Sequence, residues 1–414
     1  MERYNQLYRL YEEFDTTRLR QYQEFVDLFP PVDSPVALEH WQRANDELDA
    51  MKGAVAAAYP EADSQFATIA SLATREQTFT ALDLHSKYGR GVNVLVLDVD
   101  ETLRSAGRTD NEIPREVLYL LTRFHEAEIP IVICTGQTLE NVKGFLIQGL
   151  GNELVHSGAV SVVYEAGTGV FTPGHGAATK QLLYEDLATE VRSTFRELQS
   201  RIFSEAPTVI REGCHLQGNE FNVTLKPNFE TGSDSARSVI DEGLCYLLDL
   251  LGNVVARVVG IEADAETWAR RYYAASDPEI RAVLEATDRL PTDESGAIPD
   301  SIAALFDRID VAYYEADAAE VTSRELNKVA GVKAALDVLG IDDPHALVMG
   351  DSKSDLRVME WARAENAGIA AAPEHASPDV LEHVRSTDDL VFDPGDAGEL
   401  LRTAFALNCI AELP

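Results

Sequence analysis

Two pairs of aspartates follow apolar segments, and their spacing suits chemistry on a charged group. Asp98 and Asp100 end one apolar run, and Asp351 and Asp355 follow a second one. Because side chains alternate along a strand, Asp98 and Asp100 would point the same way. Two such carboxylates could bind a metal ion together, or one could act as a nucleophile and the other as an acid. The alternatives are an ordinary turn after the first run and a capped helix start after the second.

If both pairs meet at one sheet edge, four carboxylates crowd together. Such crowding is costly unless a hard cation neutralises the charge, and Mg²⁺ is the natural choice. The sequence therefore predicts a Mg²⁺ site that involves Asp98, Asp100, Asp351 and Asp355.

Two further segments offer groups that could hold a phosphate. Thr135 and Gly136 follow a third apolar run, and a hydroxyl beside the amides of a glycine turn can bind phosphate. Lys328 precedes a helical stretch over 329–339, and its ammonium could offset phosphate and carboxylate charge. The turn could equally be a helix cap and Lys328 a solvated side chain, and Lys333 competes for the same role.

Strands that alternate with helices must position these groups. The segment pattern predicts strands over 92–97, 129–134, 346–349, 367–371 and 390–392, with helices over 114–127, 139–150 and 329–339. This alternation predicts an α/β fold with a doubly wound parallel sheet, similar to a Rossmann fold. Ligand sites in such sheets form outside the carboxyl ends of the strands, where the aspartates stand.

The remaining segments predict an extension and an insertion. Residues 1–88 have helical periodicity, with helices expected over 37–59 and 62–88. Between the two α/β parts, 89–159 and 319–414, lies an α+β region over 160–318. Its expected elements are strands at 221–225, 254–259 and 311–314 and a helix over 235–251. An insertion of this kind inside a split α/β domain is typical of a cap.

Composition excludes several function classes. Acids number 70 against 35 Lys and Arg, and the resulting net charge of −35 disfavours nucleic acid and anionic membranes as partners. No apolar run is long enough for a membrane span and no secretory signal is visible.

Four widely spaced cysteines form no CxxC pair, which fits a reducing cytoplasm. The chain has only eight lysines, and this acid-rich, Lys-poor balance resembles proteins of salt-in halophiles; an acidic mesophilic protein is the alternative.

Taken together, the motifs resemble those of the haloacid dehalogenase (HAD) superfamily of phosphohydrolases. They follow the family's order along the chain, over about residues 92–405: Asp98, Asp100 and Thr102, then Thr135, then Lys328, then Gly350, Asp351 and Asp355. The insertion between the second and third motifs implies a C2-type cap, and Ser157-Gly158-Ala159 is similar to a segment of the Cof-like, type IIB branch. Departures from that branch are Glu101 for Gly, Gln137 for Arg, and Ser157 and Ser354 for Asn.

The resemblance implies a Mg²⁺-dependent phosphatase that works through an aspartyl phosphate. Asp98 would be the nucleophile and Asp100 the general acid and base. Mg²⁺ would be held by Asp98, the backbone carbonyl of Asp100, and Asp351, with Asp355 close by. Thr135, Gly136 and Lys328 would hold the phosphoryl oxygens.

The cap would select a small phosphorylated substrate, such as a sugar phosphate or a phosphoglycolate-like acid. Polar candidates for that contact are Arg211, His215, Asn222 and Lys226. A phosphomutase, which returns the phosphoryl group to the substrate, remains open. So does a non-enzymatic scaffold that uses the N-terminal helices, which could also form a homo-oligomer. A dehalogenase fits the acid set least well.

Overall fold

The chain folds into two compact units. The computed structural model describes residues 2–29, 35–62, 64–104, 113–219, 221–261, 265–291 and 297–413. One unit comprises Met1–Gln181 together with Gly331–Pro414, and the other comprises Leu182–Ala330. The first unit is therefore discontinuous in sequence, and the second is inserted into it.

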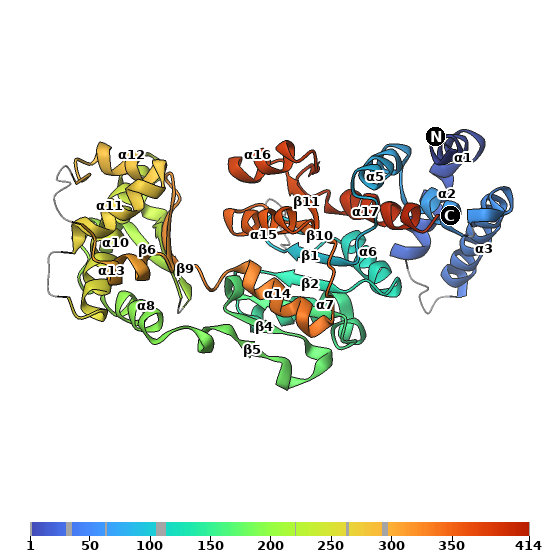
Figure 1. Ribbon diagram of the computed structural model, residues 1–414. Coiled ribbons are helices and arrows are strands. Elements are labelled where there is room, and N and C mark those ends of the chain that lie inside the picture. Colours follow the sequence, from blue (N-terminus) through green and yellow to red (C-terminus); the bar gives the residue numbers. More distant parts are fainter. Residues whose placement is uncertain are drawn as a thin grey trace. The chain divides into compact units, whose positions relative to one another are not determined.

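A mostly parallel sheet of eight strands forms the centre of the first unit (Figure 1). Its strand order is β12-β11-β10-β1-β2-β3-β4-β5, and pairing is parallel from β12 to β3 and antiparallel between β3 and β4. The strands are β1 (Val94–Asp98), β2 (Ile131–Cys134), β3 (Val160–Tyr164), β4 (Gly169–Phe171), β5 (Gln181–Leu182), β10 (Ala346–Met349), β11 (Gly368–Pro373) and β12 (Leu390–Phe392). The expected doubly wound α/β core is confirmed.

The position of β1 decides where the site forms. Every residue of β1 is buried, as expected for an apolar strand of a sheet covered on both faces. It lies between β10 and β2, with Leu97 opposite Met349 and Asp98 opposite Cys134. The carboxyl ends of three neighbouring strands therefore meet at one edge of the sheet.

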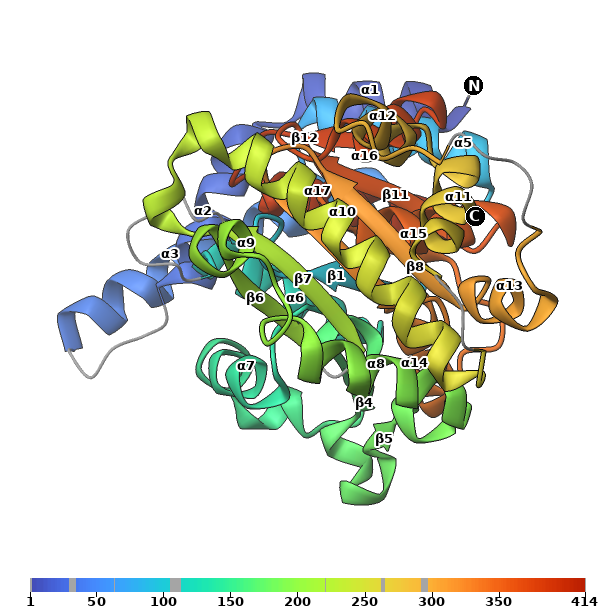
Figure 2. The ribbon, with the colours of Figure 1, turned by 90° about the vertical axis from the view of Figure 1, so that its left-hand side faces the viewer.

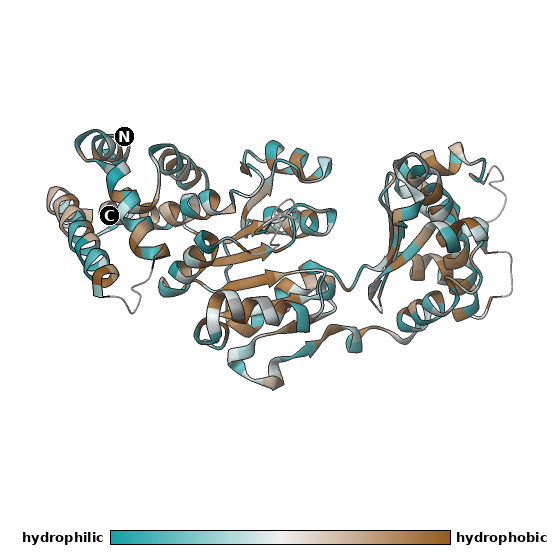
Figure 3. Ribbon diagram, turned by 180° about the vertical axis from the view of Figure 1, so that it is seen from behind, coloured by the Kyte–Doolittle hydropathy of each residue, from teal (hydrophilic) through white to brown (hydrophobic). Residues whose placement is uncertain are grey.

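Helices cover this sheet, and their apolar sides face it. They are α6 (Arg115–Glu126), α7 (Leu139–Val155), α14 (Lys328–Leu339), α15 (Lys353–Ala364), α16 (Pro378–Ser386) and α17 (Ala397–Ala411). Figure 3 shows the strands of the sheet as largely hydrophobic ribbons among helices of mixed character. At Gly331 an added Cβ would lie 2.3 Å from Val163 on β3, so α14 packs closely against the sheet.

The N-terminal segment is a helical layer of the same core. Its helices are α1 (Glu2–Glu13), α2 (Thr16–Leu28), α3 (Pro35–Ala58), α4 (Gln65–Leu72) and α5 (Arg75–Tyr88). The single helix expected over 62–88 is wrong, because Thr74 begins a new helix with a capping box to Gln77. Leu7 and Phe66 share one buried cluster with Leu95. These helices thus bury their apolar side within the unit.

The inserted unit is a four-stranded antiparallel sheet with helices. The strand order is β6 (Cys214–Asn219), β7 (Asn222–Pro227), β9 (Ala318–Ser323) and β8 (Ile309–Tyr314). The helices are α8 (Thr189–Arg201), α9 (Thr208–Gly213), α10 (Ser233–Val258), α11 (Glu266–Ser276), α12 (Pro278–Ala286) and α13 (Asp300–Phe306). Figure 2 shows the long helix α10 running along this sheet, where Leu244 joins Val223 and Val321 in one apolar cluster.

Two expectations for this region are corrected. The segment 254–259, expected to be a strand, forms the last five residues of α10 and its C-terminal cap, because a short run of β-branched residues fits a buried helix face as well as a strand. The expected cap limits, 160 and 318, also differ from the observed division. Strands β3 to β5 extend the core sheet, and β8 and β9 complete the inserted one. Among the described residues, no helix combines the length and the apolar character that a membrane crossing requires.

Candidate active site

Three of the four predicted aspartates converge at the carboxyl ends of β1 and β10. Carboxylate oxygens of Asp98, Asp351 and Asp355 all lie within 4.8 Å of one another. Asp98 is 6% exposed and Asp355 3% exposed, and Asp351 is partly buried. Water screens such a group poorly, so the three negative charges repel strongly. Three converging carboxylates are the donor set that a hard divalent cation accepts.

The start of α15 fixes Asp355 in this group. Ser352 precedes the helix, and both its backbone N–H and its hydroxyl donate to Oδ2 of Asp355, at 3.1 and 2.6 Å. Gly350 faces the same side chain, and a Cβ built on it would lie 2.3 Å from both Cβ and Cγ of Asp355. Glycine at 350 therefore permits the close approach of Asp355 to the strand end.

Asp100, the fourth aspartate, is bonded on both of its oxygens. Oδ1 accepts hydrogen bonds from Nε and Nη2 of Arg104 at 2.9 and 2.6 Å. Oδ2 accepts a hydrogen bond from Nε2 of Gln137 at 2.7 Å. The side chain of Asp100 is 48% exposed, so it can meet a solvent-borne ligand while it is held.

A tight turn returns Arg104 to Asp100. The backbone N–H groups of Leu103 and Arg104 both donate to the carbonyl of Val99 at 3.1 Å. Glu101 has φ of +58° in this turn, which is the left-handed region where a glycine is favoured. The Cof-like motif that the sequence resembles has its glycine at this position. Glu101 also lies 3.6 Å from His375, with which it pairs when the histidine is protonated.

The predicted phosphate-binding turn follows β2, next to β1. Thr135 is fully buried, and its backbone N–H donates to the carbonyl of Val163 on β3 at 2.9 Å. Its Oγ1 accepts from the backbone N–H of Gln137 at 3.1 Å. Gly136 is exposed, and nothing lies within 4 Å of where its Cβ would be. A backbone donor of this turn can therefore approach a ligand without obstruction.

The two candidate lysines differ in their surroundings. Lys328 begins α14, behind Asn327, whose side chain caps the helix by accepting from Ala330 N–H at 3.0 Å. It is 3% exposed, and a buried ammonium is costly unless it is paired. Lys333 is exposed, and its Nζ lies 5.5 Å from the ring centroid of Trp361. Of the two candidates, Lys328 is thus the buried one and Lys333 the exposed one.

The four polar candidates of the inserted unit occupy different places. Arg211 is exposed on α9, and His215 is exposed on β6 opposite Lys226. Lys226 lies 3.7 Å from Asp317, and Asn222 donates to Glu320 at 3.0 Å.

Glu320, which lies opposite Thr224 on β9, was not predicted from the sequence. Arg104 was not predicted either, although an acid followed four residues later by an arginine is a usable signal for such a pair. Burial raises the pKa of Glu320, whereas its hydrogen bonds from Thr224 and Asn222 oppose that rise.

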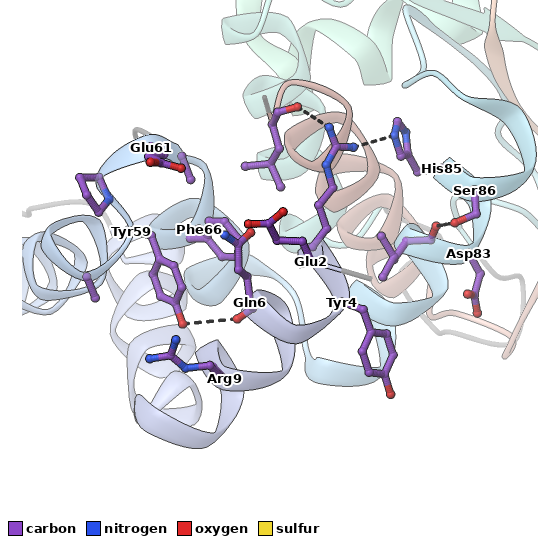
Figure 4. A pocket seen from close by; sticks show the side chains of 16 residues that line it. Glu2, Tyr4, Gln6, Arg9, Tyr59, Glu61, Phe66, Asp83, His85 and Ser86 are labelled. Atoms are coloured by element: carbon purple, nitrogen blue, oxygen red, sulfur yellow. Dashed lines mark hydrogen bonds between the residues drawn. The ribbon is translucent and has the colours of Figure 1, made fainter.

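A cavity of about 1020 Å³ lies elsewhere in the first unit, among its N-terminal helices (Figure 4). Arg3 lines it, with Nη1 3.0 Å from Nε2 of His85 and Nη2 donating to the carbonyl of Leu413 at 2.6 Å. None of the predicted site residues lines it. The chemistry expected from the sequence is therefore separate from this cavity.

One segment of this chain matches a known protein family, and several solved structures are similar to most of the chain. Residues 276–387 match the model of the family described as haloacid dehalogenase-like hydrolase. A HAD/COF-like hydrolase from Plasmodium vivax is 13% identical, with a TM-score of 0.46, and covers 81% of this chain and 100% of its own. The trehalose-6-phosphate phosphatase of Aspergillus fumigatus is 14% identical, with a TM-score of 0.42, over 80% of this chain and 97% of its own.

A haloacid dehalogenase-like hydrolase from Bacteroides thetaiotaomicron gives 14% identity and a TM-score of 0.42, over 76% of this chain and 98% of its own. The matched segment includes Lys328, Gly350, Asp351 and Asp355, and the fold brings the last two to Asp98. Over residues 276–387, and in the order of its motifs, the chain is therefore similar to haloacid dehalogenase-like hydrolases.

Proposed function

We propose that this protein is a phosphatase that hydrolyses small phosphoric monoesters through an aspartyl phosphate on Asp98. The observation that carries the proposal is the convergence of Asp98 with Asp351 and Asp355, at the end of the central strand β1. A carboxylate at such a place can attack phosphorus once its charge is balanced. Asp100, two residues further on, supplies a second carboxylate at the same sheet edge.

In the first step, an oxygen of Asp98 forms a bond to phosphorus while the bond from phosphorus to the leaving oxygen breaks. The electron pair of that bond goes to the leaving oxygen, which takes a proton from Asp100 and departs as an alcohol. In the second step, water attacks the phosphorus of the aspartyl phosphate and gives a proton to the Asp100 carboxylate. The bond between phosphorus and the Asp98 oxygen breaks, its electron pair returns to the Asp98 carboxylate, and phosphate leaves, so both aspartates regain their starting forms.

The three converging carboxylates fit a divalent cation, and Mg²⁺ is the proposed one. Asp98, Asp351 and Asp355 would hold it, together with the backbone carbonyl of Asp100. When bound, it would neutralise the carboxylates and the charge of the phosphoryl group. Thr135, Gly136 and Lys328 are the proposed groups for the phosphoryl oxygens, supported by the burial of Thr135 at the end of β2 and of Lys328 at the start of α14.

A sugar phosphate is the substrate class that we propose first, with phosphoglycolate-like acids second. The inserted unit carries polar side chains along β7 and β9 that suit hydroxyl groups, among them Asn222, Thr224 and Glu320. The trehalose-6-phosphate phosphatase named above acts on a sugar phosphate, as its name states.

Release of inorganic phosphate from a panel of phosphate esters tests the proposal. The panel contains sugar phosphates, phosphoglycolate and 4-nitrophenyl phosphate, each with Mg²⁺ in molar KCl. We expect release that requires Mg²⁺ and falls at least about 1,000-fold in the Asp98→Asn variant. Wild-type-like release by that variant would overturn the nucleophile assignment. Isomerised phosphate esters without free phosphate would identify a mutase instead.

A further inference from the structure

Asp100 is held from two sides by residues that the proposed reaction does not use. The guanidinium of Arg104 donates twice to Oδ1, and the amide of Gln137 donates once to Oδ2. Hydrogen bonds from a charged donor to a carboxylate are short and strong, and a fork of two fixes direction as well as distance. The carboxylate therefore has one preferred orientation although its side chain is half exposed.

Both donors are themselves anchored by backbone contacts. Arg104 closes the turn that begins at Val99, and its side chain is only 12% exposed. The backbone N–H of Gln137 donates to Oγ1 of Thr135, and its carbonyl accepts from the N–H of Glu165 at 2.9 Å. These residues are therefore placed before a substrate arrives, which is the condition for a catalytic group to be oriented without a further entropy cost.

We infer that Arg104 and Gln137 are positioning residues, which hold Asp100 in the orientation where it exchanges a proton with the leaving oxygen and with water. The inference rests on the proposed function and deepens it. Gln137 and Arg104 bond different oxygens of Asp100, so the plane of its carboxyl group is held from both sides.

The choice of leaving group tests this inference, because residues with a merely structural role would affect the sugar phosphate and the aryl phosphate equally. A sugar alkoxide needs a proton to depart, whereas 4-nitrophenolate departs without one. Since kcat/KM reports the steps up to formation of the aspartyl phosphate, it depends on Asp100 for the sugar phosphate and far less for the aryl phosphate. Hydrolysis of the aspartyl phosphate needs Asp100 as a base with either substrate, so kcat falls with both.

The variants are Gln137→Met and Arg104→Met, which remove the donors at similar length, and their combination. For the best sugar phosphate of the panel, we expect kcat/KM to fall about 10-fold in Gln137→Met, which loses one hydrogen bond to Asp100. We expect a fall of at least about 10-fold in Arg104→Met, which loses two. For 4-nitrophenyl phosphate, we expect a fall of less than about 3-fold in kcat/KM, with a burst of 4-nitrophenolate before a slower steady state.

Two further variants serve as controls. Arg43 pairs with Glu39 at 3.0 Å with the same spacing of four residues between acid and arginine, but this pair lies on α3. We therefore expect Arg43→Met to leave kcat and kcat/KM unchanged for both substrates. Arg104→Lys keeps the charge and part of the hydrogen bonding, and should recover part of the loss if Arg104→Met folds poorly. Thermal unfolding of every variant separates loss of fold from loss of positioning.

Equal falls in kcat/KM for the sugar and aryl phosphates, in folded variants, would overturn the inference and leave the phosphatase intact. Unchanged kinetics in the double variant would overturn it as well. Absence of phosphate release by the wild-type protein from every substrate would instead overturn the proposed function, and the inference with it.

Discussion

Gly350 and Asp355 face each other so closely that a methyl group on the first would lie 2.3 Å from two carbons of the second. Asp355 belongs to the group of three aspartates, and its carboxylate is also fixed by Ser352. The backbone of β10 and the first turn of α15 therefore fit together only because residue 350 has no side chain.

The Gly350→Ala variant should consequently displace Asp355. We expect a loss of about 1–3 kcal/mol in the free energy of unfolding, as for other overpacked positions, and at least about a 10-fold loss of phosphatase activity. Urea unfolding and Mg²⁺ titration of activity measure the two effects. Gly53→Ala on α3 is the matched control: nothing lies within 4 Å of its Cβ, and a helical alanine should stabilise slightly. An active, fully stable Gly350→Ala variant would contradict the packing argument.

Removal of metal should reveal the repulsion among the three aspartates. Without Mg²⁺, Asp98→Asn removes one of three crowded charges, so we expect its unfolding temperature to rise above that of the wild-type protein. With Mg²⁺ the order should reverse, because the wild-type protein gains more from the bound cation. Calorimetry in EDTA and in Mg²⁺ checks both. Identical responses of the two proteins to Mg²⁺ would mean that Asp98 holds no metal.

Glu101 has a left-handed backbone conformation that costs an L-residue about 1–2 kcal/mol. Glu101→Gly should therefore stabilise the protein by up to about 1 kcal/mol, after allowance for the greater freedom of glycine in the unfolded chain. Ala316→Gly, at φ of +60° and without a charged side chain, isolates the backbone contribution. A stable Ala316→Gly together with a destabilised Glu101→Gly would show that the pairing of Glu101 with His375 outweighs the strain.

The pH dependence of the inserted unit should reflect Glu320. Burial raises the pKa of Glu320 in the folded protein, so the folded state binds its proton more tightly than the unfolded state does. The penalty for the ionised form is therefore absent below the unfolded pKa of about 4.3 and grows as pH rises towards the folded value.

Glu320→Gln removes this penalty and keeps partners for Asn222 and Thr224. At pH 7 we expect the variant to be more stable than the wild-type protein. At pH 4 we expect this advantage to be absent. Urea unfolding at the two pH values provides the comparison. An advantage that does not change with pH would show that ionisation of Glu320 is not its source.

Salt should stabilise the protein. The net charge of −35 produces self-repulsion in the folded state, and molar salt reduces the screening length to about 3 Å. We expect the unfolding temperature to rise steeply between low salt and molar KCl, as the resemblance to halophilic proteins implies. Sucrose at equal osmolality is the control, because it leaves charge repulsion unscreened. A flat response to KCl would favour the acidic mesophilic alternative.

The sequence predicted the parts of the fold that depend on local pattern. Buried parallel strands such as β1 and β10 have continuous apolar runs, and the positions of Asp98 and Asp351 at their ends followed directly. The end of α10 was missed because β-branched residues such as Val254 and Val255 pack in a helix when a large core covers them.

Contacts between segments that are distant in sequence could not be predicted from the sequence. Gln137 was visible only as a departure from a motif, and its bond to Asp100 joins turns that follow two different strands. Glu320 gained importance only when β9 paired with β7. Side-chain type and spacing along one segment therefore located the aspartates, whereas the groups that orient them depend on strand order and register.

The discontinuity of the first unit has a consequence for the nascent chain. On the ribosome, β1 emerges before the whole segment Leu182–Ala330, while β10, its parallel neighbour, emerges after it. The inserted unit is continuous in sequence and has its own apolar cluster, so it can fold while β1 still lacks β10. An apolar strand with one open edge is a template for aggregation. Synthesis of this protein thus includes an interval in which chaperone binding to the segment 92–99 would matter most.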